Sequence, residues 1–213
     1  MHTSLPRALR SIQHLAVLAG GLLSLTAALA QPAPSASSAP DSAQAVALPK
    51  LASALRQGGY VIYFRHTATD FSRTDAGMRN YDDCDNQRLL SSQGRSQARA
   101  IGRHIATLKL PPVQALASPM CRTMETAQLM LGRVTPDNTL REGSAGDYPG
   151  LRQLLAGPVP AGSNRWLVGH GTPFRALAGP PHLAEGEAAI LRPEGTQWTV
   201  VARVLPQEWA QLK

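Results

Sequence analysis

The sequence predicts an α/β protein, a three-layer α/β/α sandwich with a mostly parallel sheet. Short apolar runs at residues 60–64, 113–117 and 166–169 have the length and composition of strands that are buried on both faces. Segments in which apolar residues recur at helical spacing lie between and after these runs. Strands that alternate with helices are typical of a parallel sheet covered by helices on both faces.

Each element has its own signal in the chain. The clearest helix is 91–108, where Ala98, Ile101, Ile105 and Leu108 recur along one face. The polar stretch 67–90 is predicted to be a functional loop or a lid, because loops of this length are uncommon in compact domains. In chain order we expect a helix at 49–57, a strand at 60–64, a helix at 91–108, a strand at 113–117, a helix at 122–131, one or two helical turns at 151–155, a strand at 166–169, a helix from 173 to 177, and a final hairpin of 188–191 and 197–204 that turns through Pro193-Glu194-Gly195.

The N-terminus is predicted to direct export. Arg7 and Arg10 precede an uncharged apolar stretch at 15–30, which ends in a small-x-small cleavage pattern before Gln31. We interpret residues 1–30 as a signal peptide; the alternative is a membrane anchor, which the short stretch with Gly and Ser disfavours. Residues 31–47 are almost entirely Ala, Pro, Ser and Gln and are predicted to be a disordered linker, followed by a single domain at 48–213. We therefore expect a periplasmic or secreted protein without a stable membrane span after cleavage.

The charge balance points to anionic partners. The formal net charge is +7, from 21 basic and 14 acidic residues, and loss of Arg7 and Arg10 leaves 19 against 14, or +5. Scattered basic residues, few aromatic residues and predicted export argue against nucleic acid as a partner. A small anionic substrate or an anionic cell envelope explains the charge better. The plain alternative is a soluble basic surface with no specific partner.

The chain contains only two cysteines, Cys84 and Cys121. An even number of cysteines in an exported protein favours a disulfide, whereas two buried free thiols are the alternative. A bridge would tether the loop after the first strand to the segment that carries Arg122. In the loop-entropy model, this cross-link would stabilise the folded state by about 3–4 kcal/mol. The chain has no CxxC or HxxxH pattern, so we expect no metal site.

Basic residues follow the ends of the predicted strands. Arg65 and His66 follow the first strand, Arg122 opens a helix after the second, and His170 follows the third. Ligands of open α/β sheets bind outside the carboxyl ends of the strands, so these four side chains are expected in one crevice. Two guanidinium groups and two imidazoles around one point suit a phosphate. The structural alternative, four unrelated residues with ordinary partners, is less consistent with this placement.

Four segments resemble the histidine phosphatase superfamily, which includes the phosphoglycerate mutases. The resemblance extends over most of residues 58–204, and the motifs occur in the family's order and spacing. Phe64-Arg65-His66-Thr67 resembles the Arg-His-Gly signature, 89–98 resembles Leu-Ser-x-x-Gly-x-x-Gln-Ala, 118–127 matches Ser-Pro-x-x-Arg-Thr-x-Glu-Thr-Ala, and 168–171 matches the second histidine motif. The cysteines and the export signal are similar to a periplasmic bacterial subgroup.

The resemblance implies a phosphoglycerate mutase-like fold and a role for each site residue. His66 is expected to be the nucleophile that forms a phosphohistidine, with Arg65, Arg122 and His170 binding the phosphate and no cofactor. The family's mutase-like branch has a Glu after a Leu as general acid, which favours Glu142. Asp70 and Asp147 are the alternatives, and the Asp that follows the second His in the other branch is Gly171 here.

Two positions depart from the family pattern. The signature glycine is Thr67, whose side chain either narrows the pocket or donates its hydroxyl to phosphate. A Ser or Asn contact of the family falls near Ser72. The sequence thus predicts an exported, cofactor-independent phosphatase that hydrolyses small phosphomonoesters or an envelope phosphate. The alternatives are a noncatalytic phosphate-binding module on the same fold, or a phosphomutase.

Overall fold

The computed structural model describes residues 46–110, 112–143 and 146–213. The predicted signal peptide and most of the predicted linker lie outside this range. Val46, which the sequence placed in the linker, donates its amide to the carbonyl of Val201 (2.7 Å) and packs against the core. In the described part of the chain, no helix is long and apolar enough to span a membrane.

The elements alternate along the chain as predicted. Their bounds are α1 Leu48–Gln57, β1 Tyr60–Arg65, η1 Cys84–Asn86, α2 Ser92–Leu108, β2 Pro112–Ala117, α3 Cys121–Leu131, β3 Thr135–Pro136, η2 Asn138–Leu140, α4 Pro149–Ala156, β4 Asn164–Gly169, α5 Gly171–Ala178, β5 Ala188–Glu194, β6 Gln197–Val204 and η3 Pro206–Gln211. The 3₁₀ helices and the two-residue strand β3 were not predicted, because they are too short to carry a periodic pattern.

The strands form one six-stranded sheet in the order β3-β2-β4-β1-β5-β6. The first four strands of this order are parallel to one another, and β5 is antiparallel to both β1 and β6. The final hairpin is confirmed, but its turn begins at Gly195 rather than at Pro193. Pro193 and Glu194 still belong to the strand and pair with Trp198 and Gln197. The structure is therefore a mixed α/β fold with a mostly parallel sheet.

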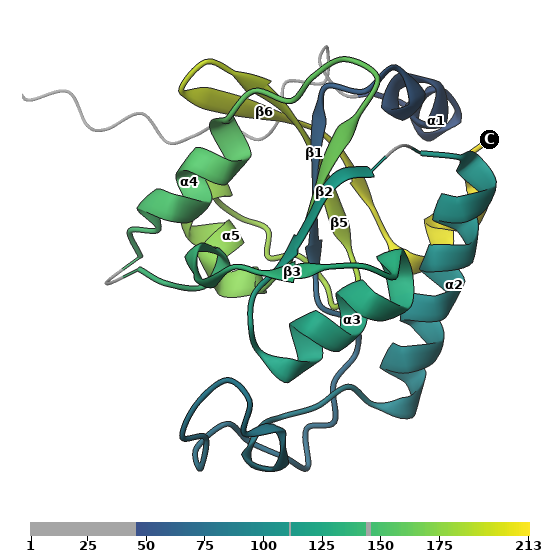
Figure 1. Cartoon of the computed structure of the whole chain (residues 1–213). Helices are drawn as coiled ribbons and strands as arrows, with labels where there is room; N and C mark the ends of the chain where they lie inside the picture. The colour runs from purple at the N-terminus through teal and green to yellow at the C-terminus, as the bar shows by residue number, and fades with distance from the viewer. Residues whose placement is uncertain (1–45, 111, 144–145) are drawn as a thin grey trace, which may run out of the picture. The chain divides into compact units, whose positions relative to one another are not determined.

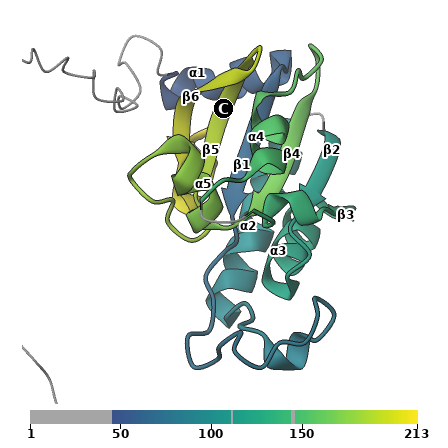
Figure 2. The same cartoon turned by 90° about the vertical axis from the view of Figure 1, so that its left-hand side faces the viewer.

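Helices cover both faces of the sheet (Figures 1 and 2), and alternate side chains of each strand point to opposite faces. Ile62 and Phe64 of β1 pack into a core with α1, α2, α3 and η3. Val61 and Tyr63 of the same strand pack into a second core with α4 and α5. This period-two division builds the three layers that the sequence predicts and places the carboxyl ends of β1, β2 and β4 at one edge.

The start of α2 is fixed by two local features. Ser91 is its N-cap, and the Ser91 hydroxyl accepts a hydrogen bond from the amide of Gly94 (3.0 Å). Gly94 lies against the backbone of Ala68, where a Cβ would overlap the Ala68 carbonyl. The helix can therefore approach the segment that follows His66 only with glycine at this position.

Candidate active site

The ends of three parallel strands are joined by main-chain hydrogen bonds that continue the sheet ladder. The amide of His66, just after β1, donates to the carbonyl of Gly169 at the end of β4 (3.0 Å). The amide of Ser118, just after β2, donates to Val168 of β4 (2.9 Å). Because these bonds align the three ends, the residues that follow them lie at one place, as the sequence predicts.

A pocket of about 300 Å³ lies at these ends, and the four predicted residues line it together. The surrounding loops add more basic and polar side chains, and no carboxylate belongs to the described lining. The lining residues are Arg65, His66, Arg88, Arg122, Arg141, Tyr148, His170, Gly171, Thr172, Pro173 and His182. A small anion is the ligand class that such a lining favours.

His66 is held as a neutral imidazole with a defined tautomer. Its side chain is buried, and its Nδ1 lies 3.0 Å from the carbonyl of Thr67, so Nδ1–H donates and Nε2 keeps its lone pair. Burial lowers the pKa of His66 to about 3; the hydrogen bond to Thr67 opposes this shift, while Arg122, Arg65 and Arg88 lower the pKa further. A neutral imidazole with a free Nε2 is the form that can act as a nucleophile.

His170 lies beside His66, with the two ring centroids 5.7 Å apart and the rings edge to face. Its Nε2 is 2.9 Å from the hydroxyl of Ser118, which orients the ring. Its main chain is held by Tyr63, whose hydroxyl donates to the His170 carbonyl (2.8 Å) and accepts from the His170 amide (2.9 Å). Burial lowers the pKa of His170 well below its usual value, and His66 and Arg122 lower it further. His170 is therefore a neutral, fixed hydrogen-bonding group.

Arg65 and Arg122 are each anchored by one terminal nitrogen. Nη1 of Arg65 donates to the carbonyl of Leu183 (2.7 Å). Nη1 of Arg122 donates to the Asp75 carboxylate (3.0 Å) and to the Arg88 carbonyl (3.4 Å). The Nε atoms of both arginines are buried, and no acceptor for them lies within the described residues. The Nε–Nη2 edge of Arg122 is thus unpaired and has the fork geometry that binds two phosphate oxygens, whereas Arg65 keeps Nε–H unpaired and faces Glu185 with Nη2 (3.6 Å).

Two carboxylates lie behind these arginines. Glu185 is 3.6 Å from Nη2 of Arg65 and accepts hydrogen bonds from the amide and hydroxyl of Thr69. Asp75 pairs with Arg122 and accepts from the amide of Arg88 (2.9 Å). Burial raises the pKa of Asp75, but the hydrogen bond from Arg88 and the charge of Arg122 outweigh it and lower this pKa below its usual value. Both acids offset part of the positive charge at the strand ends.

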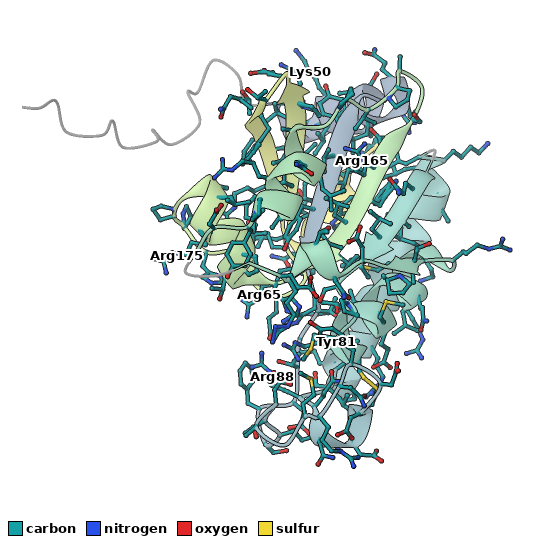
Figure 3. The ribbon with its side chains drawn as sticks, turned by 60° about the vertical axis from the view of Figure 1, so that its left-hand side comes forward. Lys50, Arg65, Tyr81, Arg88, Arg165 and Arg175 are labelled. Atoms are coloured by element: carbon teal, nitrogen blue, oxygen red, sulfur yellow. A yellow bond between two sulfur atoms is a disulfide. The ribbon has the colours of Figure 1, made fainter. Side chains whose placement is uncertain are left out.

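The sequence reasoning missed five polar side chains of the pocket: Arg88, Arg141, Tyr148, Thr172 and His182. Arg88 comes from the long loop after β1, and Figure 3 shows it next to Arg65, just beyond the end of the sheet. Loop residues carry no periodic signal, so their position follows only from the fold. The one available hint was that Arg88 and Arg141 each adjoin a segment that resembles a family motif.

The predicted general acids do not line the pocket. Glu142 is exposed just after η2, although the preceding residue, Arg141, lines the pocket. Asp70 accepts from the amide and hydroxyl of Ser72 (2.9 and 2.7 Å), and Asp147 is exposed. An Asp at position 171 would require the exposed His182 side chain to move, because a Cβ there would overlap the His182 ring. The acid role of Glu142 stays a prediction.

The two departures from the family pattern have structural explanations. The hydroxyl of Thr67 lies 3.2 Å from that of Thr126 on α3, and Thr67 is not among the residues lining the pocket. The expectation that Thr67 narrows the pocket or donates to phosphate is therefore not supported by this geometry. Ser72 is exposed and bonds to Asp70 rather than pointing into the pocket.

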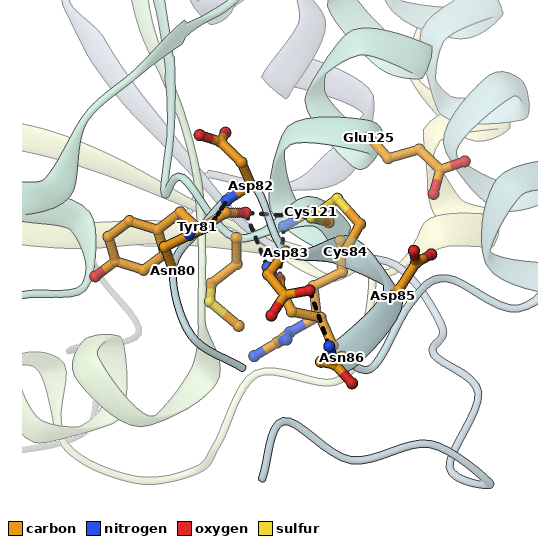
Figure 4. Close-up of a disulfide and its surroundings, with 12 residues drawn as sticks. Asn80, Tyr81, Asp82, Asp83, Cys84, Asp85, Asn86, Cys121 and Glu125 are labelled. Atoms are coloured by element: carbon orange, nitrogen blue, oxygen red, sulfur yellow. Dashed lines mark hydrogen bonds between the residues drawn. A yellow bond between two sulfur atoms is a disulfide. The ribbon is translucent and has the colours of Figure 1, made fainter. Parts of the chain in front are cut away.

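The predicted disulfide is present between Cys84 and Cys121, which joins η1 to the first residue of α3 (Figure 4). Gln87 strengthens this junction, accepting from the amide of Cys121 (3.0 Å) and donating to the carbonyl of Tyr81 (2.8 Å). The loop that carries Asp75 and Arg88 is thus tied to the helix that carries Arg122. Within the described residues, no cluster of His, Cys, Asp and Glu is arranged to hold a metal ion.

A family model described as "Histidine phosphatase superfamily (branch 1)" matches residues 61–173, which is 113 of the 213 residues. The chain belongs to the histidine phosphatase superfamily. The matched range includes His66, Arg122 and His170, so the superfamily's motifs are the segments that build the pocket.

Solved structures share this fold at low sequence identity. A SixA protein from Agrobacterium tumefaciens is 18% identical, with a TM-score of 0.50 over 69% of this chain and 98% of its own. The protein histidine phosphatase SixA complexed with tungstate is 19% identical, with a TM-score of 0.50 over 70% and 97%. A phosphoserine phosphatase mutant from Entamoeba histolytica in complex with phosphoserine is 12% identical, with a TM-score of 0.50 over 70% and 98%. The comparison with curated proteins gave no match.

Proposed function

We propose that this histidine phosphatase hydrolyses phosphomonoesters through a covalent phosphohistidine on His66. The observation that carries the proposal is the state of His66: buried, neutral, with Nδ1 bound to the Thr67 carbonyl and Nε2 free beside basic side chains. A structural histidine would satisfy both ring nitrogens. This one satisfies the nitrogen that fixes the tautomer and presents the other to an anion-binding pocket.

The first step transfers the phosphoryl group to the enzyme. The Nε2 lone pair of His66 forms a bond to phosphorus while the bond from phosphorus to the bridging oxygen breaks, and the alcohol departs with that electron pair. Charge in the transition state lies on three equatorial oxygens. The unpaired N–H groups of Arg65 and Arg122 can donate to them, and His170 lines the same pocket, so the contribution of these residues is positioning and electrostatic stabilisation.

The second step returns the enzyme to its starting state. Water attacks phosphorus and gives a proton to the carboxylate that donated one in the first step, the N–P bond breaks, and Nε2 regains its lone pair while inorganic phosphate leaves. The low pKa of His66 keeps the regenerated imidazole neutral and ready for another turnover. The leaving alkoxide of the first step needs a proton, for which Glu142 is the proposed donor.

We further propose that the chain acts outside the cytoplasm, after cleavage between Ala30 and Gln31. The charge pattern of residues 1–30 and the Ala- and Pro-rich stretch that follows support this. A disulfide next to the site is consistent with an oxidising compartment. The test is the N-terminal sequence of the mature protein after expression of the full chain in a bacterium. A protein that begins at Gln31 in the periplasmic fraction supports export, and an intact N-terminus in the cytosol contradicts it.

Catalysis is tested by hydrolysis of 4-nitrophenyl phosphate together with trapping of the phosphoenzyme. We expect turnover by the wild type, and phosphate on the peptide containing His66 after a denaturing, alkaline quench and mass spectrometry. His66→Asn should abolish both signals, whereas the matched control His104→Asn, on α2 away from the pocket, should retain them. Binding of phosphate without turnover would instead indicate a noncatalytic binding module.

A further inference from the structure

The pocket holds more guanidinium groups than one phosphoryl group needs. Arg65 and Arg122 form an inner pair at the strand ends, and Arg88 and Arg141 form an outer pair that comes from loops. Arg122 offers the two N–H groups of its unpaired Nε–Nη2 edge, and Arg65 adds its unpaired Nε–H. Three equatorial oxygens are well supplied by such a set, so the outer pair is available for a second acceptor.

The outer pair also differs from the inner pair in its partners. Each inner arginine faces a carboxylate, Glu185 or Asp75. In the described part of the chain, neither Arg88 nor Arg141 forms an ion pair, and Nε of Arg88 is buried without an acceptor. A partly buried guanidinium group with an unpaired N–H destabilises the folded state unless an anion accepts a hydrogen bond from it.

Arg88 is held in place although its guanidinium group forms no ion pair with the described residues. Its amide donates to Asp75, its carbonyl accepts from Arg122, and its guanidinium carbon lies 4.6 Å from the ring centre of Phe71. The main chain of Arg88 is therefore fixed to the same network that fixes Arg122. Phe71 is 69% exposed, so this aromatic support stands at the solvent side of the loop.

We propose that the outer pair, Arg88 and Arg141, binds a second anionic group of the substrate, such as a second phosphate or a carboxylate, while the inner pair binds the phosphoryl group that is transferred. The inference rests on the proposed function, because the second group is placed relative to a phosphoryl group at His66. It narrows the substrate class to phosphomonoesters that carry another negative charge close to the scissile bond.

The test is a binding measurement that does not depend on turnover. Methylphosphonate and methylenediphosphonate form a matched pair of probes that differ by one phosphonate group and resist hydrolysis. We expect isothermal titration calorimetry to show that the diphosphonate binds the wild type about tenfold to a hundredfold more tightly, as one added charge-assisted contact implies. Arg88→Gln and Arg141→Gln should each remove most of this advantage and change methylphosphonate binding less than about threefold.

Arg103→Gln is the control, because Arg103 is exposed on α2 and its loss changes the net charge by the same amount away from the pocket. Equal affinity of the wild type for the two probes would overturn the proposal. So would equal losses for both probes in the Arg88 and Arg141 variants, which would place all four arginines on a single phosphoryl group. Absence of a phosphoenzyme would contradict the proposed function while leaving this comparison of affinities intact.

Discussion

Removal of the disulfide should destabilise the domain by about 4 kcal/mol. Cys84 and Cys121 are 37 residues apart, and the loop-entropy model gives about 3.8 kcal/mol at 25 °C for a closed loop of that length. Cys84 is exposed and Cys121 is partly exposed, so serine is tolerated at both positions without an unsatisfied buried hydroxyl. The free energy of unfolding lost by Cys84→Ser/Cys121→Ser should therefore come mainly from the unfolded chain.

Urea unfolding followed by circular dichroism measures this change. The double variant and the wild type treated with a reductant should unfold at the same, lower urea midpoint. A midpoint equal to that of the oxidised wild type would refute the reasoning, because the hydrogen bonds of Gln87 would then hold the loop without help from the covalent bond. We also expect kcat/KM to fall, since the loop supplies Asp75 to Arg122.

Three further predictions concern single side chains. The pKa of His66 is about 3 in the folded chain and about 6.5 in the unfolded chain, so between these pH values only the unfolded chain binds this proton. The free energy of unfolding should therefore fall as the pH drops below 6.5, by up to about 1.4 kcal/mol per pH unit. Urea unfolding at a series of pH values should show that the free energy of unfolding of His66→Gln depends less steeply on pH. Ser118→Ala should lower kcat about tenfold with little change in KM, because the His170 ring loses the partner of Nε2; a larger effect on KM would contradict this. The acid role of Glu142 predicts that Glu142→Gln slows hydrolysis of an alkyl phosphate far more than that of an aryl phosphate, and equal losses would remove Glu142 from that role.

The strands and long helices could be predicted because burial imposes a pattern on them. The sheet buries both faces of β1, so Val61, Ile62, Tyr63 and Phe64 form an unbroken apolar run. The inner site residues could be predicted for the same reason, since His66 and His170 follow such runs directly. Parallel strands bring their carboxyl ends together, which converts sequence position into spatial proximity.

The outer half of the site could not be predicted in this way. Arg88 and Arg141 are placed by irregular backbone whose course depends on particular hydrogen bonds, such as the one from the Arg88 amide to Asp75. Hydrogen bonds of this kind leave no periodic pattern in the sequence. For Glu142 the position in the sequence matched a family motif, but a motif match does not determine where a side chain lies in the fold. The Glu142 side chain is exposed and does not line the pocket.

The placement of the carboxylates divides the pocket into two parts with different kinetic roles. Glu185 and Asp75 offset the charges of Arg65 and Arg122, so the uncompensated positive charge of the pocket lies mainly at Arg88 and Arg141. Binding of a substrate that carries a second anionic group therefore depends chiefly on the outer pair, which contributes equally to the ground state and the transition state.

The inner pair has little net charge to contribute but a fixed geometry. Each of its guanidinium groups is anchored through Nη1, and Arg65 also faces Glu185 through Nη2, so the unpaired N–H groups are already oriented when the phosphoryl group arrives and little side-chain freedom remains to be lost. Such preorganised donors act most strongly where charge develops on the equatorial oxygens. Loss of an outer arginine should therefore appear mainly in KM, and loss of an inner arginine mainly in kcat.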